Sequence, residues 1–402
     1  MKLRAVRCLV VIACVTAAVA GSASGLSRPS RSLPMAGSKI ACGYDFCLTV
    51  NVDGSLWAWG KNGDGQLGLG DTKDRHSPTR VGTANDWAAV AGGLSHSLAL
   101  KTDGSLWAWG LNNHGQLGLG DSVLEEDSPT QVGTATDWVA VACGWEHSLA
   151  LKSDGTLWAW GDNSSGQLAV GSAGLPSVTT VADPIQVGSG KDWVVAAAGG
   201  DSSLGLKNQG SLWGWGNNRS GQLGLGNRGP YGVKVVPTRV GVAGDWSAIA
   251  CGGFDTLALK ADGSLWAWGS NKYGELGLGD AKGRLIPTRV GRASNWTAVA
   301  CSGVHSLALK TNGSLWAWGM NNHGQLGLGD TTQRHTPKRV GVARGWTAIA
   351  CGSYYANGDH NLALREDGSL WAWGGNGAGQ LGLGDTKSRH VPTRVPGWSL
   401  SP

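Results

Sequence analysis

Ser55-Leu56-Trp57-Ala58-Trp59-Gly60, followed by Asn62 and Gly65-Gln66-Leu67-Gly68-Leu69-Gly70-Asp71, is the stretch that decides the fold. It returns almost letter for letter in six further copies, whose first tryptophans are Trp107, Trp158, Trp213, Trp266, Trp316 and Trp371. The copies lie 50 to 55 residues apart and fill the chain from about residue 38 to its end. Because repeated units share one continuous core, the 402 residues are predicted to form one repeat domain.

Each unit is predicted to contain four short strands, here named a to d in chain order. In the second unit these are Ala88–Ala91, Ser97–Lys101, Ser105–Trp109 and Pro129–Val132. Asp103-Gly104 lies between the second and third strands and is typical of a two-residue hairpin turn. Seven units of four antiparallel strands indicate an all-β fold, a seven-bladed β-propeller with blades arranged radially.

The paired tryptophans of strand c are expected to fill the wedges between blades, because alternate residues of a strand share one face. They are Trp57, Trp59, Trp107, Trp109, Trp158, Trp160, Trp213, Trp215, Trp266, Trp268, Trp316, Trp318, Trp371 and Trp373. The first unit lacks the tryptophan that precedes strand a in the others, and Trp398 near the C-terminus supplies one. We therefore expect the N- and C-terminal segments to share one repeat and to close the ring.

The repeats resemble the regulator of chromosome condensation repeat family. The family's Trp-Gly-x-Asn-x-x-Gly-Gln-Leu-Gly-x-Gly core is intact at 109–120, and its Gly-x-x-His-Ser-Leu-Ala-Leu stretch at 93–100. The resemblance covers nearly all of residues 38–398 and implies a seven-bladed propeller. It also implies guanine-nucleotide exchange on a small GTPase, with matching positions at Glu146 with His147, Asp201, and Asp359 with His360.

Residues 1–20 have the features of an export signal. Three cationic residues precede an apolar run that ends in Ala18-Val19-Ala20, a small-residue cleavage site. We expect residues 21–38 to be a disordered lead-in and residues 39–402 to be the propeller. The protein is then exported (secreted, periplasmic or at the cell surface), as a bacterial-type member of the family would be, and is not stably inserted in a membrane. Cleavage lowers the net charge from +5 to about +2, with scattered cations, which argues against nucleic-acid binding.

Cysteine and histidine follow the repeat. Five cysteines occupy one repeat position, at Cys42, Cys143, Cys251, Cys301 and Cys351, and we expect five separate buried small residues. Cys47 alone is off the pattern. With Cys42 it flanks a short turn, so the pair forms either a local disulfide or two thiols. The nine histidines fall on three repeat positions in different blades, so neither a metal site nor a catalytic triad is predicted, and no cofactor is implied.

The departures from the repeat lie on one face of the predicted disc. Turns a–b and connections c–d emerge on that face, and it carries the length changes of units 3, 4 and 7. Aromatic and acidic side chains outside the repeat gather there, which is how interfaces are built on rigid scaffolds. The candidate partner-binding residues are Tyr44, Trp145, Glu146, Asp201, Tyr231, Phe254, Tyr273, Tyr354, Tyr355 and Asp359.

The hypothesis that these features favour is an exported, non-catalytic scaffold that binds a protein partner on that face and is itself a monomer. Nucleotide exchange is a second hypothesis, but the predicted export conflicts with an intracellular reaction. A secreted enzyme inhibitor is a third hypothesis, and a carbohydrate-binding propeller is a fourth. The sequence does not identify the partner.

Overall fold

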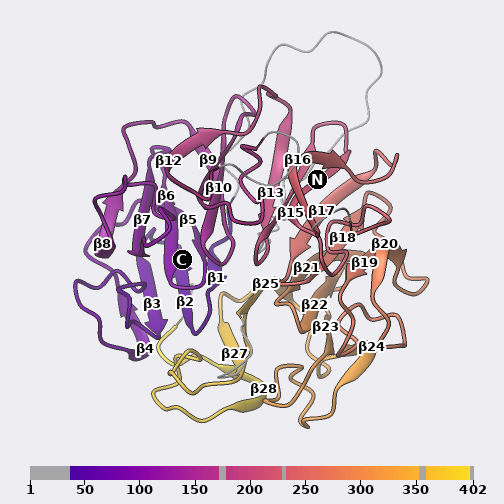
Figure 1. Cartoon of the computed structure of the whole chain (residues 1–402). Helices are drawn as coiled ribbons and strands as arrows, with labels where there is room; N and C mark the ends of the chain where they lie inside the picture. Colours follow the sequence, from indigo (N-terminus) through magenta and orange to yellow (C-terminus); the bar gives the residue numbers. More distant parts are fainter. Residues whose placement is uncertain (1–36, 172–177, 229–231, 353–358, 399–402) are drawn as a thin grey trace, which may run out of the picture.

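The computed structural model describes residues 37–171, 178–228, 232–352 and 359–398. Within these ranges the chain forms seven four-stranded antiparallel sheets and no α-helix. Figure 1 shows the sheets arranged as blades around one axis, in chain order. The seven-bladed propeller predicted from the repeat is therefore confirmed. The same residues include no helix long and apolar enough to cross a bilayer.

Strand a of each blade lies innermost, and it contacts strand a of the next blade around the whole ring, β25 against β1 included. These inner strands are β1 (Ile40–Cys42), β5 (Trp87–Gly92), β9 (Trp138–Cys143), β13 (Trp193–Ala198), β17 (Trp246–Cys251), β21 (Trp296–Cys301) and β25 (Trp346–Gly352). Strands b follow, as β2 (Phe46–Val50), β6 (His96–Lys101), β10 (His147–Lys152), β14 (Ser202–Lys207), β18 (Asp255–Lys260), β22 (His305–Lys310) and β26 (His360–Arg365).

Strands c carry the tryptophan pairs, and strands d form the outer edge of each blade. Strands c are β3 (Leu56–Gly60), β7 (Leu106–Leu111), β11 (Leu157–Asp162), β15 (Leu212–Asn217), β19 (Leu265–Gly269), β23 (Leu315–Gly319) and β27 (Leu370–Gly374). Strands d are β4 (Arg75–Arg80), β8 (Glu125–Gln131), β12 (Thr180–Gln186), β16 (Val233–Arg239), β20 (Arg284–Arg289), β24 (Arg334–Arg339) and β28 (Arg389–Arg394).

The outer strand of the second blade starts earlier than the sequence predicts. The prediction is Pro129–Val132, whereas β8 starts at Glu125, opposite Leu111 of β7. Its first four residues are Glu125-Glu126-Asp127-Ser128, which have no apolar alternation. An outer strand with little to bury can be polar throughout, so the periodicity that locates inner strands is missing here.

The two tryptophans of strand c have different surroundings. The second of each pair, such as Trp109, is fully buried between blades, whereas the first, such as Trp107, is only partly buried. Trp87, which begins strand a, packs edge-on against both, with ring centroids 5.8 and 6.2 Å away. Burying one indole removes roughly 150–250 Å² from water. At about 25 cal/mol per Å² this stabilises the fold by at most ~4–6 kcal/mol per indole.

One backbone carbonyl joins each blade to the next. The Gln66 carbonyl of blade 1 accepts hydrogen bonds from Trp109 Nε1 and Ser97 Oγ of blade 2, both at 2.8 Å. The loop that presents it is shaped by Asn62, whose Oδ1 accepts from Leu67 N at 2.9 Å. Gly68 has φ +70°, and a Cβ there would lie 2.8 Å from Trp109 Nε1. The repeated Asn and Gly residues are thus explained by the approach of the next blade's indole.

The same arrangement recurs at all seven junctions between blades. The accepting carbonyl, the indole and the strand-b side chain are Gln66, Trp109 and Ser97; Gln116, Trp160 and Ser148; Gln167, Trp215 and Ser203; Gln222, Trp268 and Thr256; Glu275, Trp318 and Ser306; Gln325, Trp373 and Asn361; Gln380, Trp59 and Cys47.

The first and last blades exchange no strand, and a C-terminal side chain completes blade 1. All four strands of blade 1 and of blade 7 are consecutive in the chain. Trp398, 5% exposed, packs edge-on against Trp57 of blade 1, with centroids 5.9 Å apart. Trp87 makes the same contact with Trp107 inside blade 2. The prediction that the two ends share one repeat is confirmed, since the C-terminus supplies the leading tryptophan of blade 1.

Replacement of Trp398 by Ala should lower the free energy of unfolding by about 3–5 kcal/mol, because it empties a buried indole site. Trp87→Ala, inside an unbroken part of the chain, is the matched comparison and should cost a similar amount. Val342→Ala, at a position 89% exposed, should change little. Chemical denaturation followed by circular dichroism measures all three. A Trp398→Ala variant as stable as the parent would contradict closure by this side chain.

Candidate binding face

The two faces of the disc differ in chemistry. The loop face is formed by turns a–b and connections c–d, and the turn face by turns b–c and loops d–a. On the turn face one network recurs: Ser105 Oγ donates to Asp103 Oδ1, Trp107 Nε1 donates to Ser105 Oγ, and Lys101 Nζ lies 4.6 Å from the Trp107 ring centroid. Equivalent residues repeat it in other blades, for example at Asp262, Ser264 and Trp266. The turn face is therefore largely explained by structure.

On the loop face, turns a–b surround the axis and are joined by backbone hydrogen bonds. Tyr44 N donates to Gly93 O, Leu94 N to Trp145 O, and Trp145 N to Gly200 O, at 3.0–3.2 Å. Together they border a recess of about 80 Å³ at the mouth of the axial channel. The turns of blades 1 to 4 are thus held in one rigid rim.

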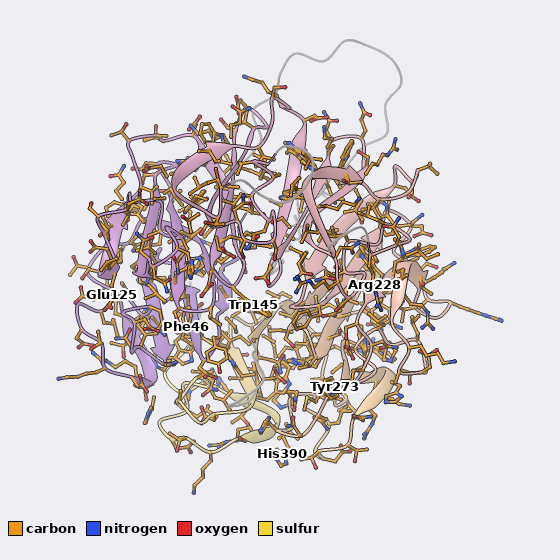
Figure 2. All side chains as sticks on the ribbon, in the orientation of Figure 1. Phe46, Glu125, Trp145, Arg228, Tyr273 and His390 are labelled. Atoms are coloured by element: carbon orange, nitrogen blue, oxygen red, sulfur yellow. The ribbon has the colours of Figure 1, made fainter. Side chains whose placement is uncertain are left out.

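Trp145 bridges this rim. It belongs to blade 3, yet it packs edge-on against Phe254 of blade 5, with ring centroids 5.5 Å apart. A Cβ at Gly200 of blade 4 would lie 2.9 Å from the indole, so glycine makes room for it. Figure 2 shows Trp145 close to the centre of the ring and Tyr273 farther out. Trp145 and Phe254 are both half-buried. They form a fixed apolar surface near the axis.

Acidic side chains lie beside this aromatic pair. Glu146 Oε2 is 3.4 Å from His114 Nε2, and both side chains are about one-third exposed, at 32% and 34%. Asp162 Oδ2 accepts from Gln167 Nε2 and Ser164 Oγ. Burial, followed by the charges of Asp162 and Glu146, raises the pKa of Asp201 to about 6. Asp162 and Glu146 thus place negative charge near Asp201 on the loop face of blades 3 and 4.

The other predicted contact residues have different surroundings. Tyr44 and Tyr273 are half-buried, with Lys61 and Lys272 ammonium groups 5.5 and 5.1 Å from their ring centroids. Asp359 is only 6% exposed, and its Oδ2 accepts from Gln325 Nε2 at 2.9 Å, so its position indicates a structural role. Three further candidates lie outside the described residues: Tyr231, Tyr354 and Tyr355.

Position in a turn a–b does not predict side-chain direction. The sequence places Asp45 and Asp255 in these turns, where acidic residues are expected at the surface, but Asp255 begins β18 and the two side chains are 2% and 1% exposed. Asp45 accepts from Gln380 Nε2 at 2.9 Å. Phe46 lies next to the same turn as Tyr44, yet it is fully buried at the start of β2, where β6 has His96.

The positions matched to nucleotide exchange are mostly buried. His147 and His360 are fully buried between blades, and His147 Nε2 lies 3.0 Å from Ser203 Oγ. Burial lowers the pKa of His147 to about 3, so this imidazole stays neutral at physiological pH. Of these positions only Glu146 and Asp201 are partly exposed, and both belong to the acidic group already described.

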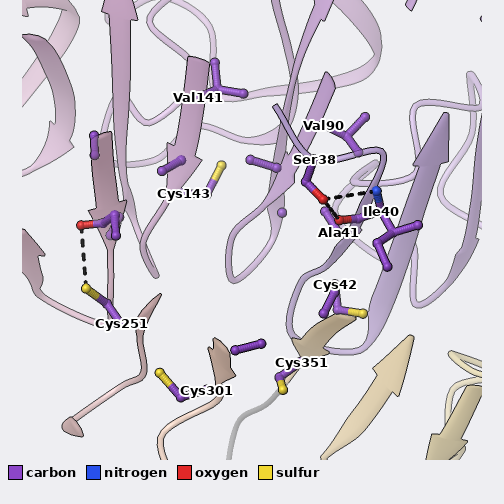
Figure 3. A pocket seen from close by; sticks show the side chains of 18 residues that line it. Ser38, Ile40, Ala41, Cys42, Val90, Val141, Cys143, Cys251, Cys301 and Cys351 are labelled. Carbon is purple, nitrogen blue, oxygen red and sulfur yellow. Dashed lines mark hydrogen bonds between the residues drawn. The ribbon is translucent and has the colours of Figure 1, made fainter. Parts of the chain in front are cut away.

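The five repeat-equivalent cysteines border one cavity, and only Cys301 is buried, so the expectation of five buried residues is wrong for the other four. Because strand a lines the axis in every blade, Cys42, Cys143, Cys251, Cys301 and Cys351 all border one axial cavity of about 100 Å³ (Figure 3). Nothing within a single repeat indicates this convergence. Equivalent positions meet only because the ring is closed.

Cys42 and Cys47 are cross-strand partners in β1 and β2, with sulfurs 3.3 Å apart as two thiols. The disulfide between them therefore stays a prediction. His360 of blade 7 reaches across the closing junction, with Nε2 3.2 Å from Cys47 Sγ. Burial would raise the pKa of the Cys42 thiol, but the hydrogen bond with Cys47 and the His360 charge lower it to about 6. Sequence pattern alone does not group His360 with these cysteines.

The raised pKa of Asp201 leads to a prediction. Since its folded pKa of about 6 exceeds the unfolded value near 3.8, folding takes up a proton between these pH values. The associated stability is present at low pH and is lost as the pH rises through 6. The stabilisation of Asp201→Asn relative to the parent should therefore be larger at pH 7.5 than at pH 4.5, by about 2 kcal/mol.

Denaturant unfolding at several pH values measures this difference for the parent, Asp201→Asn and a control, Glu366→Gln. Glu366 is exposed on the turn face, so its neutralisation should leave the pH profile nearly unchanged. Parallel profiles for the parent and Asp201→Asn would contradict the assignment.

Comparisons with known proteins agree with this architecture. An RCC1-like domain model matches residues 126–401, and models of the regulator of chromosome condensation (RCC1) repeat match 53–100, 38–66 and 87–116. The ultraviolet-B receptor UVR8 of Arabidopsis thaliana is 34% identical over 61% of this chain and 56% of its own length. The mitochondrial RCC1 domain-containing protein RUG3 of the same plant is 31% identical over 89% and 57%. The chain thus spans little more than half the length of these two relatives.

Solved structures show the same fold. Human WBSCR16 superposes with a TM-score of 0.74 at 25% identity, over 85% of this chain and 94% of that one. Prp20p of Saccharomyces cerevisiae gives 0.74 at 24% identity, over 87% of both chains. The family model of an RCC1-like domain covers more than half of the chain. The chain belongs to the RCC1-repeat family of seven-bladed β-propellers.

Proposed function

We propose that this protein is an exported, non-catalytic scaffold that binds a protein partner on the loop face. The observation that carries the proposal is the chemical difference between the two faces. The turn face repeats one Asp–Ser–Trp–Lys network, whereas the loop face carries Trp145, Phe254 and an acidic group that occur once each. Residues held on a rigid rim without a repeated structural role are suited to recognition.

The chemistry of the loop face favours a basic partner with an apolar anchor. Half-buried aromatic side chains near the centre of a patch supply most of the binding free energy in typical interfaces. Glu146 and Asp201 beside them attract cationic side chains and disfavour acidic ones. The partner segment that fits is therefore one with Lys or Arg beside a hydrophobic residue.

Relatives are consistent with a binding role without defining the partner. The yeast propeller Prp20 has been solved with Kap60 bound, so a propeller of this fold can engage another protein. Prp20 is 23% identical to this chain, which relates the two by fold alone. The human ligases HERC6 and HERC5 match only 37% and 35% of this chain, and 15% and 13% of their own lengths. Matches this short imply no ligase activity for this chain.

Export is part of the proposal and is supported by the N-terminal sequence. Lys2, Arg4 and Arg7 precede the apolar run Cys8–Ala20, the order found in secretory signals.

Nucleotide exchange is the weaker hypothesis, because His147 and His360 are buried and Asp359 is held by Gln325. A secreted enzyme inhibitor would be one form of the proposed scaffold, with an enzyme as its protein partner. Binding to a glycan array would distinguish a carbohydrate-binding propeller from a scaffold that binds proteins.

Charge reversal on the two faces tests the proposal. Glu146→Lys adds a cation to the loop face, and Glu366→Lys makes the same change on the turn face, at an exposed side chain. Proteins captured from the source organism on immobilised parent protein would be identified by mass spectrometry. Glu146→Lys should weaken capture of the specific partner by roughly tenfold or more, and Trp145→Ala should do the same.

Glu366→Lys should capture the partner as the parent does. Binding by the parent should also weaken as salt is raised, since exposed charges are screened. If the two charge-reversed variants lost partner capture equally, or if Glu146→Lys lost none, the assignment of partner binding to the loop face would be contradicted.

A further inference from the structure

The junction that closes the ring contains a group of metal-ligating atoms. Cys42 Sγ and Cys47 Sγ are 3.3 Å apart, and His360 Nε2 is 3.2 Å from Cys47 Sγ. All three atoms lie within 4.8 Å of one another. Among the described residues this is the one group of three or more Cys, His, Asp or Glu side chains with that geometry.

At this junction alone, the strand-b side chain beside the accepting carbonyl is a cysteine. Where blades 2 to 7 have Ser, Thr or Asn beside the accepting carbonyl, blade 1 has Cys47. Between blades 2 and 3, for instance, His96 Nε2 lies 3.1 Å from Ser148 Oγ, and Cys143 is the cross-strand partner of Ser148. A hydroxyl therefore satisfies the fold at this position, and the second thiol needs another explanation.

The sheet holds the two sulfurs on one side. Gly43 N donates to Phe46 O, and Val50 N donates to Lys39 O. Cys42 and Cys47 are therefore a non-hydrogen-bonded pair, the kind whose side chains approach most closely. His360 comes from β26 of the neighbouring blade and is fully buried. The three donors are thus positioned by regular strands on both sides of the junction.

We propose that Cys42, Cys47 and His360 form a zinc-binding site that ties blade 7 to blade 1. Sulfur and imidazole nitrogen are the donors that Zn²⁺ prefers, at about 2.3 and 2.0–2.1 Å. Tetrahedral bond angles at these lengths place the donors roughly 3.5–3.8 Å apart. The two separations that involve Cys47, 3.2 and 3.3 Å, therefore need to widen by only a few tenths of an ångström, and Cys42 Sγ and His360 Nε2 already lie within 4.8 Å of each other.

Charge favours Zn²⁺ over Cu⁺, the other soft ion that thiolates select. Two thiolates and a neutral imidazole neutralise Zn²⁺, whereas Cu⁺ would leave one negative charge. The charges of Asp45 and Asp359 already act on His360. A buried site beside two carboxylates would therefore disfavour further negative charge.

The site is accessible from the axis. Cys42 is half-buried and borders both the axial cavity and the recess at its mouth (Figure 3), whereas Cys47 and His360 are fully buried, so an ion would approach from the side of Cys42. Three protein ligands leave one tetrahedral position for water. Because the ligands come from the first and last blades, the ion would bind the folded ring and stabilise it by mass action.

Metal titration of matched serine variants tests the site. The full protein is reduced, stripped of metal with a chelator, desalted and titrated with Zn²⁺ against a chromophoric chelator, with Co²⁺ as a spectroscopic probe. Cys47→Ser gives blade 1 the arrangement already present around Ser148, so it should fold. Cys143→Ser is the control, because it removes a thiol of the same repeat position that has no second cysteine opposite.

The parent and Cys143→Ser should bind a single equivalent of Zn²⁺, and their Co²⁺ forms should show thiolate-to-metal charge-transfer absorption. Cys47→Ser should bind roughly 100-fold more weakly or not at all, and zinc should no longer raise its melting temperature. His360→Asn should do the same, should Cys47→Ser fail to fold. The proposal is overturned if the reduced parent binds no Zn²⁺, or if Cys47→Ser binds it as the parent does.

Discussion

One backbone carbonyl in each blade organises the protein. It belongs to the Gln of the Gly-Gln-Leu segment, or to Glu275 in the fifth blade, and accepts both an indole N–H and a strand-b side chain of the following blade. A buried hydrogen bond contributes about 1 kcal/mol, but leaving its donor unsatisfied costs more. The indole that donates to this carbonyl also fills the wedge between the sheets. Packing and hydrogen bonding therefore specify the same blade-to-blade geometry.

This constraint explains which parts of the structure are predictable from the sequence. The Trp, Asn and Gly residues recur because the indole of the next blade approaches Gly68 and its equivalents closely, so the repeat, the number of blades and Trp398 as the closing residue can be read directly. The start of β8 cannot be predicted from the sequence, because its polar residues have little apolar surface to bury and show no periodicity. Local pattern locates an element only where that element has a face to bury.

The candidate site is less predictable for a different reason. Turn position assigns Asp45, Asp255 and Asp359 to the exposed surface, but each side chain is at most 6% exposed. In two of these cases the carboxylate accepts from the Gln of the preceding blade. Trp145 and Phe254 come from blades that are not neighbours, so no pattern within one unit could pair them. Contacts between blades depend on ring closure, which a single repeat does not encode.

The repeat also provides an internal reference for identifying function. A residue that every blade shares is accounted for by the junctions, as Ser148 and its equivalents are. A residue that only one blade carries, at a position where the other blades share another residue, is not explained by the junctions. This holds where the fold tolerates the shared residue at that position. Trp145 on the loop face and Cys47 at the closing junction both meet this condition. Trp145 borders the recess at the mouth of the axis together with Cys42, the cross-strand partner of Cys47. Because inner strands of adjacent blades contact one another around the ring, residues near the axis can influence several blades at once. A substitution in a single blade near the axis can therefore affect more of the propeller than one at its outer edge.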